Sequence, residues 1–444
     1  MKPRLLSQRQ FLKETAALSS VGFFPTLVPS SVFGANPPSR RITLGCVGVG
    51  GEGGKNLGAF LGQPDAQVLA VCEVDRARLQ AARDRVNKHY QNSDCTGYGD
   101  FRELIGRKDL DAVCISTPDH WHVPMALAAV RSGKDVALEK PITRYIDEGR
   151  RLANEVAQHR RVFRVDSEFR SLEPMRRAAE LVRNGRLGKL RVIRSGSPGE
   201  VFPVESEAVT PAPAELDYDL WLGPAPEVPY LQKRVHPPHD LKSRPGWMRN
   251  LDYCDGMITN WGTHLNDIAQ WGAGTERTGP VEVKATGKFH QGKVWNVLES
   301  FDAWYRFANG IELFYQMGTP HVRFEGEKGW IQVNYIADTL NPDRLQASSP
   351  AILKEEIGPE EIRFPLRGEK EDFIEACKTR GQTMEDAEVG QRTTSLCHLA
   401  HIAIQLGGVK LRWDPDKEVF TDNAAANQLT KRPPMRAPWS LEKV

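Results

Sequence analysis

The chain has 444 residues, which is long enough for two domains with substantial hydrophobic cores. Hydrophobic residues make up 40% of it and charged residues 26%, values that are typical of a soluble globular protein. The formal net charge of +2 argues against a dedicated nucleic-acid-binding surface, which would carry a strong basic excess.

The first 35 residues have the composition of an export signal. Basic residues open the chain, and a weakly apolar run over 16–32 follows, ending in small residues. The run is too short and too rich in Ser and Pro to span a membrane. Residues 7–13 resemble the twin-arginine signal, with Gln8 where its first arginine belongs. We expect residues 1–35 to be a signal peptide of a periplasmic protein; the alternative is an amphipathic helix on a cytoplasmic one.

Residues 36–165 alternate between apolar runs and helical patterns. This alternation predicts βαβ units and a parallel sheet, as in a Rossmann nucleotide-binding domain. The expected strands are 42–48, 68–72, 112–116, 136–138 and 161–165, and the expected helices are 54–61, 76–89 and 123–132.

Residues 166–409 follow another pattern, which predicts an α+β domain with a largely antiparallel open sheet. Its expected helices are 173–184, 258–271, 366–378 and 389–406, and its expected strands are 190–195, 281–288, 297–307, 311–317 and 329–334. The stretch 198–250 is rich in Pro and aromatic residues and has little periodicity. We expect the tail, 410–444, to pack over the domains. The seven cysteines lack metal-ligand or disulfide spacing, so we expect free thiols and no metal site.

A glycine-rich loop follows the first expected strand and opens a helix. It contains Gly48, Gly50, Gly51 and Gly53, in the context that the dinucleotide-binding fingerprint requires. Gly48 permits the tight turn, Gly50 lets the backbone approach a pyrophosphate, and Gly53 lets helix and strand pack closely. The helix N-terminus then offers free N–H groups to the phosphates.

Glu73 ends the second expected strand, where an acidic residue can bind a ribose 2′-hydroxyl. An acid at this position disfavours a 2′-phosphate, so we expect the cofactor to be NAD rather than NADP. Arg76 and Arg78 keep NADP open as the alternative, because either side chain could reach a phosphate.

Further motifs resemble the glucose-fructose oxidoreductase, inositol dehydrogenase and rhizopine-catabolism (Gfo/Idh/MocA) family. The resemblance runs from Ile42 to near the C-terminus. It rests on Thr117-Pro118-Asp119-His120-Trp121-His122, Glu139-Lys140-Pro141, 219–224, Trp261-Gly262-Thr263-His264 and 436–439.

The resemblance implies a catalytic role for Lys140, placed between the nicotinamide ribose and the substrate. It also implies that the strand ends around it contact the cofactor, through Thr117, Pro118, His120, His122, Glu139 and Lys140. A histidine in this loop can instead simply pack in the core.

A second catalytic segment follows from the resemblance at residues 256–267. Asn260, His264 and Asp267 are spaced to share one helix face. Relatives commonly carry Asp and His at the first two of these positions, and His264 is the expected general base, because an imidazole titrates near neutral pH. Asn260 departs from the pattern: an amide can orient a hydroxyl but cannot relay a proton.

The expected substrate contacts are Asn260, Asp267, Arg170 and Trp261, although an ion pair between domains would explain Arg170 equally well. The resemblance implies hydride transfer between a nicotinamide cofactor and a hydroxyl carbon of a sugar or cyclic polyol. Two alternatives stay open: a redox-neutral, NAD-dependent glycoside hydrolase that forms a transient keto-sugar, and a cofactor-binding protein without turnover. We expect a homo-oligomer formed through the C-terminal sheet, and neither a nucleic-acid partner nor a membrane span.

Overall fold

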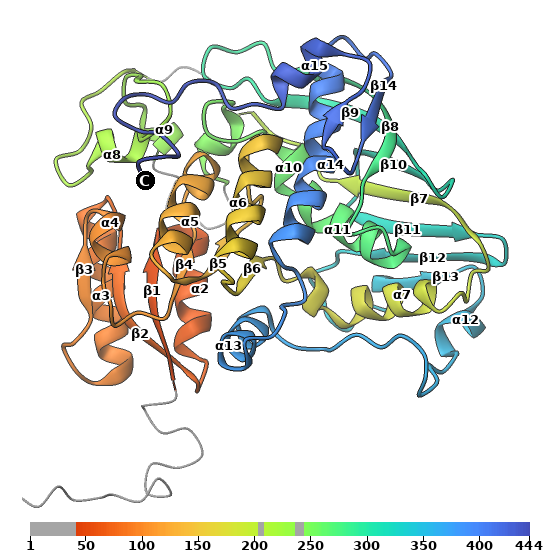
Figure 1. Cartoon of the computed structure of the whole chain (residues 1–444), viewed down its shortest axis with the longest axis horizontal. Helices are drawn as coiled ribbons and strands as arrows, with labels where there is room; N and C mark the ends of the chain where they lie inside the picture. Colours follow the sequence, from red (N-terminus) through yellow and green to blue (C-terminus); the bar gives the residue numbers. More distant parts are fainter. Residues whose placement is uncertain (1–40, 203–207, 236–243) are drawn as a thin grey trace, which may run out of the picture. The chain divides into compact units, whose positions relative to one another are not determined.

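The N-terminal part of the chain folds as a parallel sheet. The computed structural model describes residues 41–202, 208–235 and 244–444, of which Ile42–Val444 forms one unit. Six described strands pair in the order β3-β2-β1-β4-β5-β6 (Figure 1), all in parallel. The sheet consists of β1 (Ile42–Val47), β2 (Ala66–Cys72), β3 (Thr96–Tyr98), β4 (Ala112–Ile115), β5 (Asp135–Glu139) and β6 (Phe163–Asp166). The order reverses between β1 and β4, which opens a crevice at the carboxyl ends of these strands.

Helices cover this sheet because its strands are apolar along their whole length. Every residue of β4 and of β5 is buried, as a parallel sheet with two covered faces requires. The helices are α2 (Gly51–Leu61), α3 (Arg76–Tyr90), α4 (Phe101–Ile105), α5 (His122–Arg131) and α6 (Ile146–Gln158). The Rossmann architecture expected from the sequence is thus confirmed, although β3, α4 and α6 were not anticipated.

The second sheet is mixed and largely antiparallel, as expected. Its nine described strands follow the order β13-β12-β11-β7-β10-β9-β8-β14-β15, and among them β7 and β10 form the parallel pair. The strands are β7 (Leu190–Ser197), β8 (Pro280–Phe289), β9 (Leu298–Phe307), β10 (Glu312–Met317), β11 (His321–Gly326), β12 (Gly329–Asn334), β13 (Leu345–Ala347), β14 (Leu411–Asp414) and β15 (Val419–Phe420).

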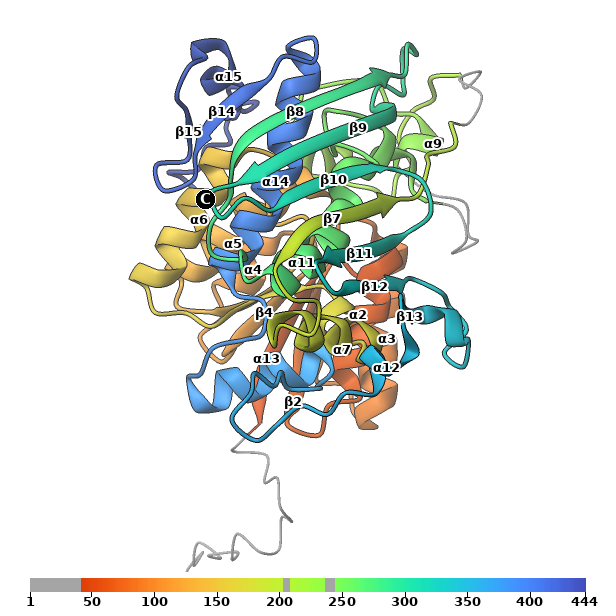
Figure 2. The same cartoon turned by 90° about the vertical axis from the view of Figure 1, so that its right-hand side faces the viewer.

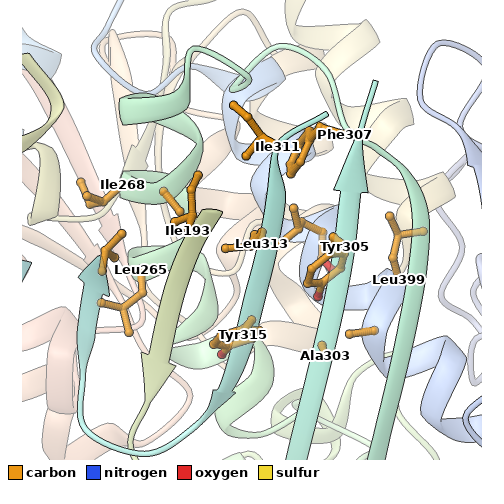
Figure 3. Packing of buried hydrophobic residues seen from close by; sticks show 14 of the residues in the cluster. Ile193, Leu265, Ile268, Ala303, Tyr305, Phe307, Ile311, Leu313, Tyr315 and Leu399 are labelled. Atoms are coloured by element: carbon orange, nitrogen blue, oxygen red, sulfur yellow. The ribbon is translucent and has the colours of Figure 1, made fainter. Parts of the chain in front are cut away.

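One face of this sheet is covered by helices, and the strands lie in front of them in Figure 2. The covering helices are α7 (Glu173–Arg183), α11 (Gly262–Ala273) and α14 (Ala387–Gln405). Side chains alternate along the strands, so that in β9 Phe301, Ala303, Tyr305 and Phe307 are all buried. Figure 3 shows Tyr305 among the residues of this core. Its buried hydroxyl donates to the Leu396 carbonyl at 2.9 Å, so no donor is left unsatisfied there.

The remaining elements are short. The stretch 198–250 holds α8 (Tyr218–Leu222), α9 (Gln232–Val235) and a 3-10 turn at Gly246–Arg249. Before the tail come α12 (Pro350–Lys354) and α13 (Glu369–Thr379). The tail contains α15 (Ala424–Leu429) besides β14 and β15. Trp439 from the tail packs against Trp121 with ring centroids 4.7 Å apart.

Three further expectations concern these elements. The helix expected over 258–271 is two helices, α10 (Met257–Asn260) and α11, which meet at Trp261. All seven cysteines are buried free thiols, as expected. The signal peptide expected over residues 1–35 lies outside the described residues. In the part of the chain that is described, no helix combines the length and the apolar composition needed to cross a membrane.

Candidate active site

A cavity of about 470 Å³ lies at the carboxyl ends of the parallel strands. Its lining includes the residues that follow β2, β4, β5 and β6, and it extends to α10 and α11. Ligands of open α/β sheets bind in this crevice. Of the residues predicted from the sequence, the lining contains Gly48, Gly50, Gly51, Glu73, Thr117, Pro118, Glu139, Lys140, Asn260 and His264.

The glycine loop at the start of α2 has the shape of a dinucleotide cradle. Gly48 has φ +76°, and a Cβ there would lie 2.7 Å from the Ser116 carbonyl oxygen. A Cβ on Gly53 would come within 1.8 Å of the Gly48 oxygen, so helix and strand pack as closely as the fingerprint predicts. The space around Gly51 is open to 4 Å. The N-terminus of the 11-residue α2 therefore faces free room for a pyrophosphate.

The Glu73 carboxylate is fixed beside this loop by backbone N–H groups. It accepts hydrogen bonds from Val49 at 3.1 Å and from Val74 at 2.8 Å. Burial raises the pKa of Glu73, and the nearby Arg78 guanidinium opposes that shift. Arg78 also lines the cavity, whereas Arg76 does not. These groups fit an NAD molecule, and the alternative of NADP now depends on Arg78 alone.

His120 and His122 differ from the expectation that they contact the cofactor. Neither ring is part of the cavity lining, and both are buried. The two nitrogens of His122 lie 2.6 Å from the Pro141 carbonyl oxygen and 2.9 Å from that of Thr117. His120 Nε2 lies 3.2 Å from the Trp221 carbonyl oxygen. Burial lowers the pKa of both rings, for His122 to about 4. Both are core histidines that hold the loop in place.

Lys140 reaches the cavity from the end of β5. Its ammonium makes no hydrogen bond or ion pair with any residue that the structure describes, so it is free to bind a ligand. The neighbouring Glu139 accepts a hydrogen bond from Asn56 Nδ2 at 2.8 Å. Burial, and then the nearby Asp166, raise the pKa of Glu139 to about 8. Burial therefore favours the neutral form of Glu139 beside Lys140.

His264 is held through one ring nitrogen. Its Nδ1 lies 2.8 Å from Ser167 Oγ and 3.8 Å from a carboxylate oxygen of Glu168, both at the end of β6. The ring stacks on Phe169 at a centroid distance of 4.4 Å. Burial, and then the Lys140 charge, lower the pKa of His264 well below its usual value. The imidazole is therefore neutral at pH 7, and when Nδ1–H donates to Ser167, Nε2 is left as a proton acceptor.

Arg170 and Asp267 lie outside the lining and pair with each other. The Asp267 carboxylate accepts hydrogen bonds from Arg170 Nε and Nη2 at 2.7 and 2.6 Å, and both side chains are buried. Trp261 is also outside the lining and packs edge-on against Tyr335, 5.1 Å between centroids. Of the four expected substrate contacts, only Asn260 thus faces the cavity. Asn260 and His264 line the cavity from either side of the break at Trp261, whereas Asp267, three residues further along α11, is engaged by Arg170.

Several residues of the site were missed in the sequence. Ser167 follows a short strand as an ordinary small residue, and Tyr335 lines the cavity from just beyond β12. Asp119 also lines the cavity, and burial raises the pKa of its carboxyl to about 7. The position of Asp119 in the motif 117–122 was the one available signal, and it does not separate that residue from its histidine neighbours.

Two profiles of one oxidoreductase family match the chain. The profile described as an NAD-binding Rossmann fold matches residues 42–167, and the C-terminal alpha/beta domain of the same family matches residues 201–441. A curated glycosyl hydrolase family 109 protein of Saccharopolyspora erythraea is 36% identical over 112 residues, 24% of each chain. An alpha-N-acetylgalactosaminidase of Shewanella oneidensis is 30% identical over 136 residues, 30% of each chain. The matches thus span a quarter to a third of these relatives.

Solved structures share the fold over most of their length. The WlbA dehydrogenase of Bordetella pertussis, in complex with NADH and UDP-GlcNAcA, aligns with a TM-score of 0.63 and 16% identity over 84% of this chain and 99% of its own. The aldose-aldose oxidoreductase of Caulobacter crescentus, complexed with glycerol, aligns with a TM-score of 0.61 and 15% identity. This alignment covers 84% of this chain and 100% of the oxidoreductase. The two profiles match both domains in the order of the chain, and the cavity lies between a glycine cradle and a lysine–histidine pair. The chain therefore belongs to the Gfo/Idh/MocA oxidoreductase family, with an NAD-binding Rossmann domain.

Proposed function

We propose that this protein oxidises a secondary hydroxyl of a sugar or sugar-like polyol with NAD. The observation that carries the proposal is the convergence of three features on one cavity: the glycine loop, the unpaired Lys140 ammonium and the neutral His264 ring. Bound NAD would supply the hydride acceptor, the chemistry that amino-acid side chains lack.

The residues of the chain would divide the remaining work. The C–H bond of the hydroxyl carbon breaks as its electron pair leaves with the hydride, while the O–H proton passes to His264 Nε2 and a C=O bond forms. Ser167 would hold the tautomer in which Nε2 is free, and the Glu168 carboxylate would stabilise the imidazolium that results. Lys140 would donate a hydrogen bond to the reacting oxygen. Asn260 would orient a second hydroxyl.

A redox-neutral glycoside hydrolase is the second candidate, favoured by the curated relatives named glycosyl hydrolase family 109 and alpha-N-acetylgalactosaminidase. In this reaction a keto-sugar forms transiently, the neighbouring C–H becomes acidic, and the aglycone is eliminated. Water then adds and the hydride returns to the sugar, so no net NADH accumulates. Asp119 lines the same cavity, and its carboxyl, with a pKa of about 7, could exchange the second proton.

One experiment tests both candidates. Purified protein is analysed by native mass spectrometry for bound NAD and is then given free sugars and nitrophenyl glycosides, with reduced cofactor and released nitrophenol followed together. Net NADH without nitrophenol supports the dehydrogenase, and nitrophenol without net NADH supports the hydrolase. Protein that binds NAD yet gives neither product across the panel would contradict both and favour a cofactor-binding protein without turnover.

Two further proposals concern location and assembly. We propose export to the periplasm, supported by the composition of residues 1–35, and expect cell fractionation to find a shortened chain outside the cytoplasm.

We also propose a homo-oligomer formed through the second sheet. On its uncovered face Arg194 lies over Phe314 and Arg323 lies over Trp330, at 5.0 and 4.0 Å from the ring centroids. Light scattering that returns the mass of a monomer would contradict the second proposal.

A further inference from the structure

Arg244 brings a guanidinium to the substrate side of the cavity. It belongs to the stretch 198–250 and lines the cavity together with Trp247. Its Nη1 lies 3.0 Å from the sulfur of Met257, the first residue of α10, and α10 ends at Asn260. A thioether is a weak hydrogen-bond acceptor and carries no charge. Arg244 is therefore held about one helical turn from a candidate substrate contact without receiving a counter-charge from that neighbour.

The nearest carboxylate is already engaged by another arginine. Glu200 Oε1 accepts hydrogen bonds from Arg249, with Nε at 3.1 Å and Nη2 at 3.0 Å. The remaining Glu200 oxygen lies 3.8 Å from Arg244 Nη1, beyond hydrogen-bond distance. Arg249 also donates to the backbone carbonyl oxygen of Arg244 at 3.0 Å. One buried carboxylate thus faces two guanidinium groups, and the Arg249–Glu200 pair fixes the backbone from which the Arg244 side chain extends.

Other charged groups line the cavity besides Arg244, whose carboxylate neighbour Glu200 is shared with Arg249. Lys140 contributes a second cation to the lining, and its ammonium makes no hydrogen bond or ion pair with a described residue. Carboxyl groups also line this cavity, and burial raises the pKa of two of them, Asp119 and Glu168. Two cationic side chains, Arg244 and Lys140, thus line the same cavity as Asn260 and His264.

We propose that the substrate is an anionic sugar, with a carboxylate or sulfate ester bound by Arg244 while Lys140 and His264 act on the hydroxyl. This inference deepens the proposed function and rests on it. A guanidinium presents two parallel N–H donors to a carboxylate or sulfate, which gives both charge and direction. Trp247 beside it would cover an apolar face of the ring. Neutral sugars would leave Arg244 with only a share of the Glu200 carboxylate as a counter-charge, because Arg249 binds the same group.

The test compares matched sugars on the NAD-loaded full chain. The probes are the methyl glycosides of glucose and glucuronate, of galactose and galacturonate, and galactose 6-sulfate. For at least one pair we expect kcat/KM to favour the anionic member by about 10- to 100-fold, the range of a charge-assisted hydrogen bond. Arg244→Gln should remove most of that preference, and Arg244→Lys should restore part of it. Carboxylate and sulfate probes separate the two anion classes.

Controls separate this effect from loss of structure. Arg367→Gln removes the same charge from an exposed position outside the cavity lining. This control should change neither the ratio of kcat/KM between the anionic and neutral sugars nor the free energy of unfolding. NAD affinity, measured by fluorescence quenching, should be the same in Arg244→Gln and wild type. Equal kcat/KM for both members of every pair, or an equal loss on neutral and anionic sugars in Arg244→Gln, overturns the inference but leaves the proposed function. Loss of NAD affinity in Arg244→Gln would place Arg244 on the cofactor and also overturn it. No turnover of any sugar overturns the proposed function itself.

Discussion

The buried pair of Arg170 and Asp267 offers a direct check of which residues touch the substrate. Replacing Asp267 with Asn keeps the shape but removes the charge. Of the two hydrogen bonds of 2.7 and 2.6 Å, one is lost because the amide NH2 of Asn cannot accept it, and the other loses its ionic character; a guanidinium that is 4% exposed is left without its counter-charge. Breaking one side of such a buried pair costs about 3–5 kcal/mol of unfolding free energy.

The neighbouring carboxyl of Glu385 affects how much unfolding free energy the loss of the Asp267 charge costs. Burial, and then the Asp267 charge, raise the pKa of Glu385 well above its usual value and so disfavour its charged form. Loss of the Asp267 charge lets Glu385 ionise more easily and partly replace it. We therefore expect Asp267→Asn to cost about 3 kcal/mol, at the lower end of the range.

Chemical denaturation of the wild type, Asp267→Asn, Arg170→Met and the double variant Arg170→Met/Asp267→Leu provides the measurement. We expect the double variant to be less destabilised than the sum of the two single changes, because no unpaired charge is left buried. The KM for sugar in the folded fraction should stay close to the wild-type value. Unchanged stability together with a KM raised tenfold or more would refute this reasoning and return Arg170 and Asp267 to the substrate.

Three more predictions address the cavity. Lys140→Ala should lower turnover by at least about a hundredfold while NAD binding survives, and undiminished turnover would remove Lys140 from the mechanism. Glu73→Ala should narrow the preference for NAD over NADP in a binding titration, and a wild type that binds NADP more tightly would shift the role to Arg78. The acid limb of the pH–rate profile should lie below the ordinary histidine pKa, because burial and Lys140 disfavour the imidazolium. Asn260→Asp adds a carboxylate to the same cavity, favours the imidazolium and should move that limb to higher pH; an unmoved limb would show that the two side chains do not interact.

Local pattern was enough to predict most of the fold. The five expected strands of the parallel sheet all form, because short continuous apolar runs between helical patterns are typical of buried strands. The missed β3 has three residues, too few for a period to show. The missed α6 begins five residues after Pro141 of the Glu-Lys-Pro motif, and a glutamate, Glu148, lies among its buried residues.

The candidate site was harder to predict, because tertiary packing decides where a side chain points. Lys140 follows strand β5, and His264 lies near the start of helix α11. The motifs around them were enough to predict that both would lie in one site, and both line the cavity. Asp267 is spaced as a third residue of that face, but its carboxylate is bound by the Arg170 guanidinium and lies outside the cavity lining. The contact of Ser167 with His264 joins residues 97 positions apart, and nothing in the local sequence signals it.

The most direct test of the central claim is a single turnover of NAD-loaded protein with a sugar deuterated at the oxidised carbon. The absorbance of the reduced nicotinamide is followed in wild type and in His264→Ala. The account predicts reduced cofactor in the wild type, formed more slowly from the deuterated sugar, and almost none in His264→Ala at any pH. Equal rates of cofactor reduction in the two proteins would contradict it, because the proton acceptor of this cavity would then be a group other than His264.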